Sequence, residues 1–575
     1  MTSLPKNIRD SASQLFFQNK ESPQYKASLI ISSLPHPDRA ILGCFIEDAA
    51  DPQEAARYFL RVILSSDGSS ASADIVSHFL LTWKILIEKF RPIEAHSLSI
   101  EDRDIIYKRD GGSCCVTRTP FKTVSDRDAK FVHVVPPRVF EDSQLSKGSS
   151  MLDMLKVFIS EELFKKIPLN FAAVQCSSLE RFDNVWLLST ETFETMRTGT
   201  IFFKVQTWEN QPEPSLKQTY LVETNLFTPK RDYRTAVQTR SMALENRIPE
   251  QAFIVSEELL SLHARFSQAL AWIETTKYIG VHFDRVNRPT RLFPFLPTGL
   301  CRVFKRIWVA LPRFMRARIY DALVLAGLRL YGTTLSMTVY RLPFGLYLRR
   351  GSPNLASKYR VEANTLQIVE KLTRIPAPRA IDVLETRRFS YLLMTRVPGR
   401  PIGQMVNSMT DEQMEQAVVD LKQYIFELRK IPKNKTSEFQ ICNSMGGGIL
   451  DWRIPDSQRE ELRFSTESEF NKYLTDPFWN EIRKRAAVSH DVQHDIVFTH
   501  GDLNPRNILF ENGKISGIVD WENAGWFPEY WEYTKAHYTV RSLIRWLADF
   551  VDQVFKEYRD ELIVENMLSD LLSPF

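Results

Sequence analysis

Two short stretches near the end of the chain contain polar residues whose types and spacing could carry out chemistry. The first, VFTHGDLNPRNILF, contains His500, Asp502 and Asn507, and the second, GKISGIVDWENAG, contains Asp520. Each set follows a short apolar run that is typical of a buried strand. We therefore expect the ends of two strands to bring two carboxylates, an amide and an imidazole to one place.

Phosphoryl transfer is the chemistry that suits these residue types, because it needs a positioned nucleophile and Mg²⁺ to neutralise phosphate charge. Asp502 would accept the proton of the attacking hydroxyl. Asn507 and Asp520 would offer hard oxygen ligands to Mg²⁺. His500 would support the loop by hydrogen bonding. Asp and Asn are also common turn residues, but here the His-Gly-Asp lead, the hairpin signal ENGK and the Asp-Trp-Glu run occur together, which favours the functional interpretation.

The elements that must position these residues can be read from the pattern around them. TVYRLPFGLYLRRG and RFSYLLMTRVPGRPI are predicted as strands. VEANTLQIVEKLTRI is predicted as a helix that stops before Pro376 and Pro378, and DEQMEQAVVDLKQYIFELRKI as a longer helix. The segment DIVFTHGDLNPRNILFENGKISGIVDWENAG reads as strand, loop, strand, turn, strand.

HGDLNPRN followed by IVDWE resembles the aminoglycoside phosphotransferase and choline-kinase-like superfamily, which is related to the protein kinases, and GWFPEYWEYTKAHY is similar to fungal members. The resemblance covers about 333–560. It implies a bilobal kinase-like fold that uses ATP and Mg²⁺, with Asp502 as base and with Asn507 and Asp520 as metal ligands. A small-molecule hydroxyl would be the acceptor, with a protein acceptor as the alternative; residues 405–490 would select it.

The N-terminal part of this resemblance departs from the family pattern. The family places a lysine on the third strand, where it holds the phosphates and pairs with a glutamate of the next helix; here the matching residues are Arg349 and Glu362. Arginine is a longer, planar, bidentate group. Gly345 lies where a nucleotide-covering loop is expected, and the backbone around Met394 and Val397 would meet adenine. The arginine leaves a pseudokinase, which binds nucleotide or acts as a scaffold, as an alternative function.

A second resemblance lies in the middle of the chain. RDGGSCCVTRTPF, FVHVVP and FDNVWLLSTETFETM resemble the HNH nuclease fold, in which histidines and an asparagine serve a metal-dependent hydrolysis. By position, His133 is the first histidine and Asn184 the asparagine, but Phe193 stands where the metal-binding histidine belongs, and Arg197 replaces an acidic neighbour. The prediction is a degenerate module, with a nucleic-acid-processing protein as a further alternative and an ordinary strand histidine as the simplest interpretation of His133.

Composition bounds the remaining possibilities. Net charge is +4, 43% of the 575 residues are apolar and 25% are charged, as in ordinary globular proteins, so bulk charge does not indicate a nucleic-acid partner. Six scattered cysteines and the absence of an apolar leader or of a run of about 18 apolar residues favour a reduced, cytoplasmic location, with the nucleus also open, and no membrane span. The basic amphipathic stretch 300–332 is expected either to pack on its own domain or to touch anionic lipid.

The sequence therefore predicts a multidomain α+β protein with a C-terminal bilobal protein-kinase-like domain and a small N-terminal ββα-type HNH-like module. Its expected parts are a helical region (1–95), the HNH-like module (96–240), a helical segment and linker (241–300), and the kinase-like domain (301–575).

Overall fold

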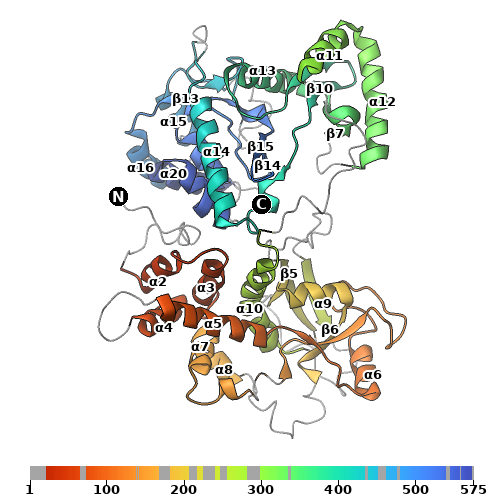
Figure 1. Cartoon of the computed structure of the whole chain (residues 1–575), viewed down its shortest axis with the longest axis vertical. Coiled ribbons are helices and arrows are strands. Elements are labelled where there is room, and N and C mark those ends of the chain that lie inside the picture. Colours follow the sequence, from red (N-terminus) through yellow and green to blue (C-terminus); the bar gives the residue numbers. More distant parts are fainter. Residues whose placement is uncertain are drawn as a thin grey trace. The chain divides into compact units, whose positions relative to one another are not determined.

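The computed structural model divides the chain into two compact units, Met1–Gly280 and Val281–Phe575 (Figure 1). The structure describes residues 21–64, 73–137, 139, 142–166, 182–205, 217–224, 240–245, 255–280, 298–333, 338–433, 438–450, 462–475, 480–538, 544–556 and 558–572. Most of the proline-containing linker expected before 300 lies outside these ranges. Within them, no helix has the length and apolar character needed to cross a membrane.

The first unit begins with helices and continues with a mixture of helices and strands. Its helices are α2 (Pro23–Ile31), α3 (Asp38–Glu47), α4 (Pro52–Ile63), α5 (Ala73–Lys89), α6 (Ile100–Arg109), α7 (Ser150–Ile159), α8 (Glu161–Lys166), α9 (Thr190–Arg197) and α10 (Glu257–Thr276). Helix α4 begins where the sequence signals it, because the Asp51 side chain accepts hydrogen bonds from the backbone N–H groups of Gln53 and Glu54, and proline occupies the first position.

The strands of the first unit form two small antiparallel sheets among the described residues. One has the order β1 (Ile93–Glu94), β2 (Ala129–His133), β3 (Val185–Ser189), and the other the order β4 (Ile201–Val205), β5 (Lys217–Thr224), β6 (Arg240–Glu245). The run CCV, residues 114–116, has a β-like sequence that predicts a short strand, but this prediction is wrong: the residues lie in a turn region flanked by a bridge between Ser113 and Pro120. The turn residues around CCV therefore outweigh its β propensity.

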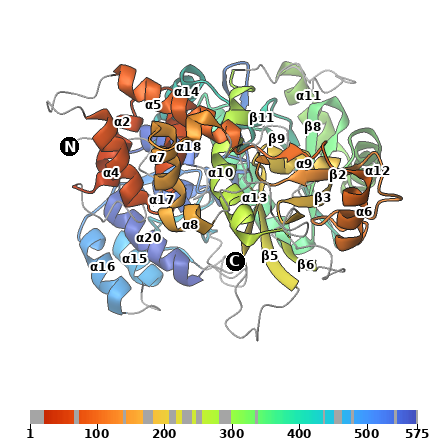
Figure 2. The same ribbon diagram turned by 90° about the horizontal axis from the view of Figure 1, so that it is seen from below.

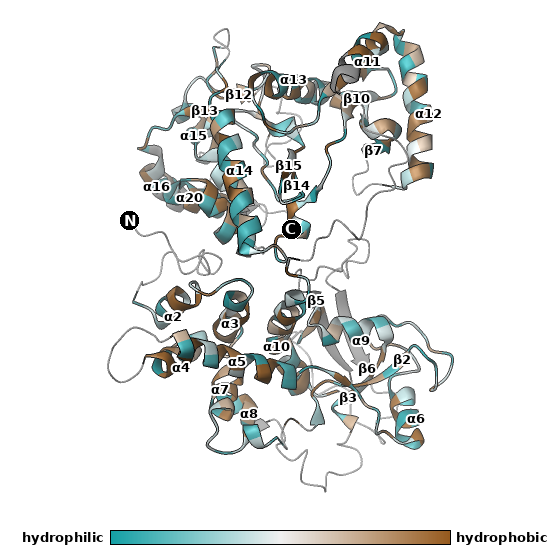
Figure 3. Ribbon diagram, viewed as in Figure 1, coloured by the Kyte–Doolittle hydropathy of each residue, from teal (hydrophilic) through white to brown (hydrophobic). Residues whose placement is uncertain are grey.

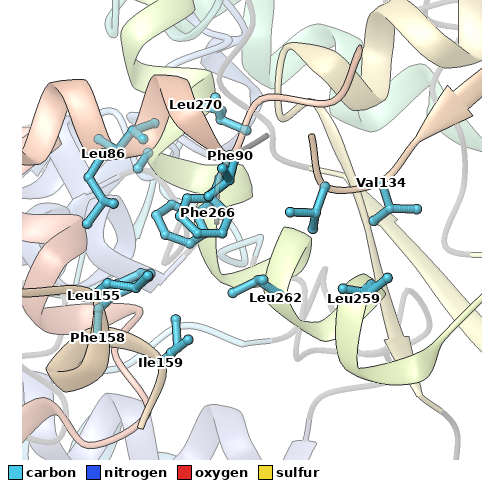
Figure 4. Close-up of a cluster of buried hydrophobic side chains, with 14 of the residues drawn as sticks. Leu86, Phe90, Val134, Leu155, Phe158, Ile159, Leu259, Leu262, Phe266 and Leu270 are labelled. Atoms are coloured by element: carbon cyan, nitrogen blue, oxygen red, sulfur yellow. The ribbon is translucent and has the colours of Figure 1, made fainter. Parts of the chain in front are cut away.

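The N-terminal helices and the α+β part of this unit share one hydrophobic core (Figure 4). Phe90 of the segment after α5 stacks on Phe266 of α10, with ring centroids 4.4 Å apart and planes inclined by 5°. Phe158 of α7 packs against the same Phe266 ring at 4.9 Å. Helix α10, which follows the β4–β6 sheet in sequence, thus joins the core of the first helices.

The second unit opens with a helical hairpin, α11 (Thr298–Ala310) and α12 (Arg313–Tyr331), followed by a four-stranded antiparallel sheet of described strands. The strand order is β7 (Val339–Leu342), β8 (Leu346–Gly351), β10 (Ser390–Thr395), β9 (Ala380–Glu385). Helix α13 (Ala356–Leu372) follows β8 and packs against β9 and β10. The predicted strand, helix and proline stop in this region are confirmed.

The rest of the second unit is mainly helical, with short strands that carry the candidate site. Helix α14 (Asp411–Arg429) begins with a reciprocal capping box between Thr410 and Gln413. Figure 2 shows α15 (Glu467–Thr475), α16 (Asn480–His490) and α20 (Arg559–Leu572) side by side. Helix α17 (Trp531–Tyr538) and three short helical segments complete the described part of this lobe: α18 (Ile544–Trp546), a π-helix (Leu547–Val551) and α19 (Asp552–Val554).

Two small sheets lie in this lobe. One has the order β11 (Arg400–Pro401), β14 (Ile508–Glu511), β15 (Lys514–Ile518), and the other the order β12 (Cys442–Asn443), β16 (Gly525–Pro528), β13 (Ile496–Thr499). The predicted ENGK hairpin joins β14 and β15. Asn512 and Gly513 both have positive φ, 52° and 77°, as a tight two-residue hairpin turn requires.

Candidate active site

His500 lies at the end of β13 and connects the loop after it to the neighbouring strand. Its imidazole is fully buried. Nε2 lies 3.0 Å from the carbonyl oxygen of Val519, while the backbone N–H of Asp502 donates to Nδ1 over 3.2 Å. Nε2 therefore carries the proton and Nδ1 is the acceptor. Burial lowers the pKa of His500 to about 4, so the ring is neutral and acts as a fixed brace.

Asp502 and Asn507 form a second contact within the same loop. The Asn507 amide donates to Oδ2 of Asp502 over 2.9 Å and to its backbone carbonyl over 3.0 Å. Burial raises the pKa of Asp502 to about 6, assisted by the charge of Asp520 and opposed by the Arg506 charge and the Asn507 hydrogen bond. A carboxylate of this pKa can accept a proton near neutral pH.

Asp520 follows β15 and faces the same place. Its backbone is left-handed, with φ 68° and ψ 60°, which is strained for a residue that carries a Cβ. The Val519 N–H donates to the Asn507 carbonyl over 2.9 Å, so the two loops are hydrogen-bonded to each other. The structure thus brings together His500, Asp502, Asn507 and Asp520, as the sequence predicts.

Arg349 of β8 contacts three carboxylates from other elements. Its Nη1 lies 3.1 Å from Glu362 of α13 and also contacts Glu522, while Nη2 contacts Asp520. We call this set, Arg349 with Glu362, Asp520 and Glu522, the carboxylate clamp. A planar guanidinium with several donors can serve partners on different sides, which the single ammonium of lysine cannot do in the same way. The clamp therefore ties the sheet to the segment after β15.

Burial and the Arg349 charge shift the pKa values of the clamp carboxyl groups in opposite directions. Burial would raise the pKa of Asp520, but the Arg349 charge and hydrogen bond outweigh it and hold the pKa below its ordinary value. Glu362 is more deeply buried, and burial raises its pKa to about 8 although Arg349 lies close. Its Oε2 is in ion-pair contact but accepts no hydrogen bond among the described residues. Glu362 therefore binds a proton at neutral pH far more readily than an ordinary glutamate does.

The predicted nucleotide loop and hinge lie next to each other. Phe344 and Gly345 form the turn between β7 and β8, both with positive φ. The backbone N–H of Arg396, between Met394 and Val397, donates to the Gly345 carbonyl over 2.8 Å. Met394 is buried in β10, and a Cβ on Gly517 would come within 2.1 Å of Val397, so the missing side chain makes room for the hinge.

Mg²⁺ and a nucleotide suit the residues present. Both Asn507 Nδ2 hydrogen bonds go to Asp502, which leaves Oδ1 as the amide atom for a cation, and Asp520 adds a carboxylate. Mg²⁺ needs one or two protein oxygens when phosphate and water complete its shell. Accordingly, the described residues contain no cage of three His, Cys, Asp or Glu side chains. Asp502 and the clamp carboxylates lie near the cations Arg349, Lys358 and Arg506, so the site holds charges of both signs.

The C-terminal part of the chain is similar to known proteins. Residues 337–562 match the phosphotransferase enzyme family. An Escherichia coli aminoglycoside 3'-phosphotransferase is 25% identical over 203 residues, 33% of this chain and 68% of that protein. A Salmonella typhimurium aminoglycoside 3'-phosphotransferase is 25% identical over 188 residues, 31% of this chain and 63% of that protein. Residues 337–562 therefore form a phosphotransferase-family domain.

Solved structures are also similar to this chain. An aminoglycoside phosphotransferase from Streptomyces rimosus, in complex with ADP and streptomycin, is 18% identical with a TM-score of 0.29; the match covers 43% of this chain and 97% of that chain. A macrolide 2'-phosphotransferase from Brachybacterium faecium is 15% identical with a TM-score of 0.29, covering 44% and 90% of the two chains.

Sequence reasoning missed three residues of the phosphotransferase-family domain. Lys358 of α13 forms an ion pair of 2.7 Å with Glu522 of the clamp. Glu532 of α17 accepts hydrogen bonds from the backbone N–H groups of His500 and Gly501, and burial raises its pKa to about 7. Glu522 stood within the Asp-Trp-Glu run, and Glu532 within the GWFPEYWEYTKAHY run, so motif position was the available signal. Nothing in the sequence marked Lys358.

The structure also places the residues of the predicted HNH-like module. His133 ends β2 and Asn184 precedes β3, on neighbouring antiparallel strands, while Phe193 is buried on α9, which packs on both. The Asn184 amide donates to the Val135 carbonyl over 2.7 Å and accepts from its N–H over 3.0 Å. Burial lowers the pKa of His133 to about 4. Asn184 thus has a backbone-bracing contact, and the nuclease resemblance stays a prediction.

Proposed function

We propose that the phosphotransferase-family domain transfers the γ-phosphoryl group of ATP to the hydroxyl of a small-molecule acceptor. The observation that carries this proposal is the convergence of Asp502, Asn507 and Asp520 with the cationic side chain of Arg349. Few other reactions need a carboxylate base, two hard oxygen ligands and a buried guanidinium at one place.

Each residue has a role that its contacts support. Asp502, with a pKa of about 6, accepts the proton as the acceptor oxygen bonds to the γ-phosphorus and the bond to the leaving β-phosphate oxygen breaks. Asn507 and Asp520 would hold Mg²⁺, which neutralises phosphate charge when bound. His500 keeps the loop in place through its two ring nitrogens. Arg349 and Lys358 supply positive charge for the phosphates of the nucleotide.

The proposal for the acceptor rests partly on what the similar proteins are named for. The curated relatives are named for aminoglycosides, and one solved relative holds ADP and streptomycin. For this chain we propose a small molecule with a hydroxyl, selected by the segment 405–490, and a protein hydroxyl as the alternative acceptor. Fold similarity does not identify the acceptor, because function resides in the site.

A pseudokinase is the second candidate, and the carboxylate clamp is the observation that favours it. Arg349 contacts Asp520, so a proposed Mg²⁺ ligand already has a cationic partner. If Mg²⁺ and nucleotide do not displace this contact, the domain would bind nucleotide weakly and turn over slowly. The two functions differ in whether Mg²⁺ frees Asp520 from Arg349.

The deciding experiment measures ATP consumption by the full chain with Mg²⁺ against a panel of hydroxyl compounds, beside Asp502→Asn. The proposed function expects acceptor-stimulated turnover that the substitution removes, with Mg²⁺-dependent ATP binding retained in a thermal-shift assay. Binding without turnover in the wild-type protein would establish the pseudokinase. Turnover that persists in Asp502→Asn would exclude Asp502 as the base.

For the first unit we propose a degenerate HNH-like module without nuclease activity. Phe193 cannot ligate a cation, and Asn184 is engaged with the backbone of Val135. Metal-dependent nicking of plasmid DNA by the full chain, lost in His133→Ala, would overturn this proposal and revive the nucleic-acid-processing alternative.

A further inference from the structure

The α11–α12 hairpin stands before the residues that match the phosphotransferase enzyme family, and its inner face is fixed to the sheet. Trp308 and Tyr320 are buried against the sheet residues Leu348 and Leu393. The Tyr320 hydroxyl donates to Asp382 of β9 over 2.6 Å, and Arg316 forms a buried ion pair with the same carboxylate. A Cβ at Gly327 would come within 2.2 Å of the Arg341 carbonyl, so α12 packs closely on β7. The hairpin is therefore a rigid platform.

The outer face of this platform is unusually apolar. Around the turn that joins the two helices, Ile307 is 64% exposed, Phe314 is 71% exposed, and further exposed apolar side chains stand beside them: Val303, Val309 and Met315. Leu325 and Leu330 continue the exposure along α12. Figure 3 shows hydrophobic and hydrophilic residues mixed along α12. Single exposed apolar residues are ordinary, but several on successive turns of one helical hairpin are typical of an interaction surface.

The exposed charges of the hairpin are mostly positive. In the described part of the hairpin, 303–331, four arginines are exposed: Arg306, Arg313, Arg318 and Arg329. The acid of this stretch, Asp321, has a side chain that is 47% exposed, but it lies 3.3 Å from Arg350 and accepts a hydrogen bond from Tyr391, so a cation of β8 offsets its charge. Arg316, the arginine turned inward, is neutralised by Asp382. Positive charge and exposed apolar groups therefore share the outer face.

We propose that this outer face docks the protein on an anionic lipid surface. Arginines placed beside exposed aromatic and aliphatic side chains suit a bilayer interface, where the apolar groups enter the boundary of the acyl region and the guanidinium groups reach the headgroups. Nucleic acid would be contacted by the arginines, but it would leave the apolar side chains around Phe314 in water. The positive charge and the exposed apolar side chains together favour an anionic lipid surface over nucleic acid as the partner. This inference does not depend on the proposed phosphotransfer.

The test is cosedimentation of the full chain with sucrose-loaded vesicles. Vesicles of phosphatidylcholine with about one third phosphatidylserine are expected to bind the protein, and vesicles of phosphatidylcholine alone are expected to bind it much more weakly. Removing two arginines, as in Arg313→Ser with Arg318→Ser, should weaken binding roughly twentyfold, at about fivefold for each charge near an anionic surface. Phe314→Ser should weaken it roughly tenfold, because an inserted ring is lost.

Helix α14 of the same domain offers matched controls. Phe426 is 61% exposed, and Lys422 and Lys430 are exposed beside it. Phe426→Ser, and Lys422→Ser with Lys430→Ser, should leave vesicle binding within twofold of the wild-type value. All variants alter exposed side chains, and equal thermal unfolding curves would verify that each is folded.

Three results would overturn the proposal. The first is failure of the wild-type chain to bind anionic vesicles, including the case in which it binds duplex DNA or an acidic polypeptide instead. The second is vesicle binding that the α14 variants weaken as much as the hairpin variants do. The third is binding that needs the arginines but is unchanged by Phe314→Ser, because this would show charge attraction without insertion.

Discussion

Replacing Arg349 with lysine tests whether Arg349 acts through its contacts with three carboxylates or only as a positive charge that lysine could supply. The family resemblance suggests that lysine would restore the usual ammonium and raise turnover. The geometry predicts the opposite, because Nη1 serves Glu362 and Glu522 while Nη2 serves Asp520. A single ammonium at the Nη1 position would leave Asp520 without its cation. We therefore expect Arg349→Lys to loosen the segment after β15 and to lower any phosphotransfer.

The size of this effect follows from the partners that remain. A hydrogen bond to a charged group contributes about 1.5–3 kcal/mol. Lys358 stays 2.7 Å from Glu522, so that carboxylate keeps a cation, and the net loss is the Asp520 contact. The Asp520 side chain is 32% exposed, and water partly replaces the lost partner. The low end of the range, about 1.5 kcal/mol, corresponds to roughly tenfold.

Hydrogen–deuterium exchange of the full chain can measure this change locally, because opening of a segment is read at its own amides. Peptides that cover α13 and residues 519–523 should exchange roughly tenfold faster in Arg349→Lys. Arg350→Lys is the matched control, since Arg350 is the next residue on β8 and contacts Asp321 and the Phe389 ring instead. The clamp reasoning is refuted if both variants exchange within twofold of wild type and Arg349→Lys matches or exceeds wild-type phosphotransfer.

Three more expectations concern pKa and buried hydrogen bonds. Asp502 has a pKa of about 6, so kcat/KM of a working enzyme should fall tenfold for each pH unit below pH 6. A pH–rate profile without this acidic limb would contradict the assignment of Asp502 as the base. Burial raises the Glu532 pKa to about 7, so its contribution to folding stability is complete below about pH 4.5 and is lost as pH rises through 7. Glu532→Gln should remove up to ~3 kcal/mol of the change in unfolding free energy between these pH values, as measured by denaturant titration, and should loosen the loop at His500. An unchanged pH dependence of the unfolding free energy would contradict this assignment. Asn184→Ala should destabilise the first unit by about 1–3 kcal/mol, because the Val135 backbone loses two buried partners; a loss below about 0.5 kcal/mol would show that the brace is dispensable.

Much of the C-terminal site can be predicted from short stretches of sequence. The apolar run before His500, the spacing of Asp502 and Asn507 and the ENGK turn are properties of neighbouring residues. They predict strand ends and a hairpin whatever the rest of the chain does. The structure has the hairpin with positive φ at Asn512 and Gly513. The same local logic failed at CCV. Cys115 makes one backbone hydrogen bond to Leu187 of β3, but no strand forms there and the surrounding turn residues prevail.

The sequence by itself determined which side chains the site has and the order in which the loops present them, because strand, turn and cap preferences act over a few residues. Tertiary structure decided what those side chains contact. Arg349 and Asp520 are 171 residues apart, and their contact exists because the sheet and the segment after β15 meet. Lys358 and Glu532 belong to the site for the same reason. Burial decided the pKa values of His500, Asp502 and Glu362, since desolvation depends on packing from elements distant in the chain.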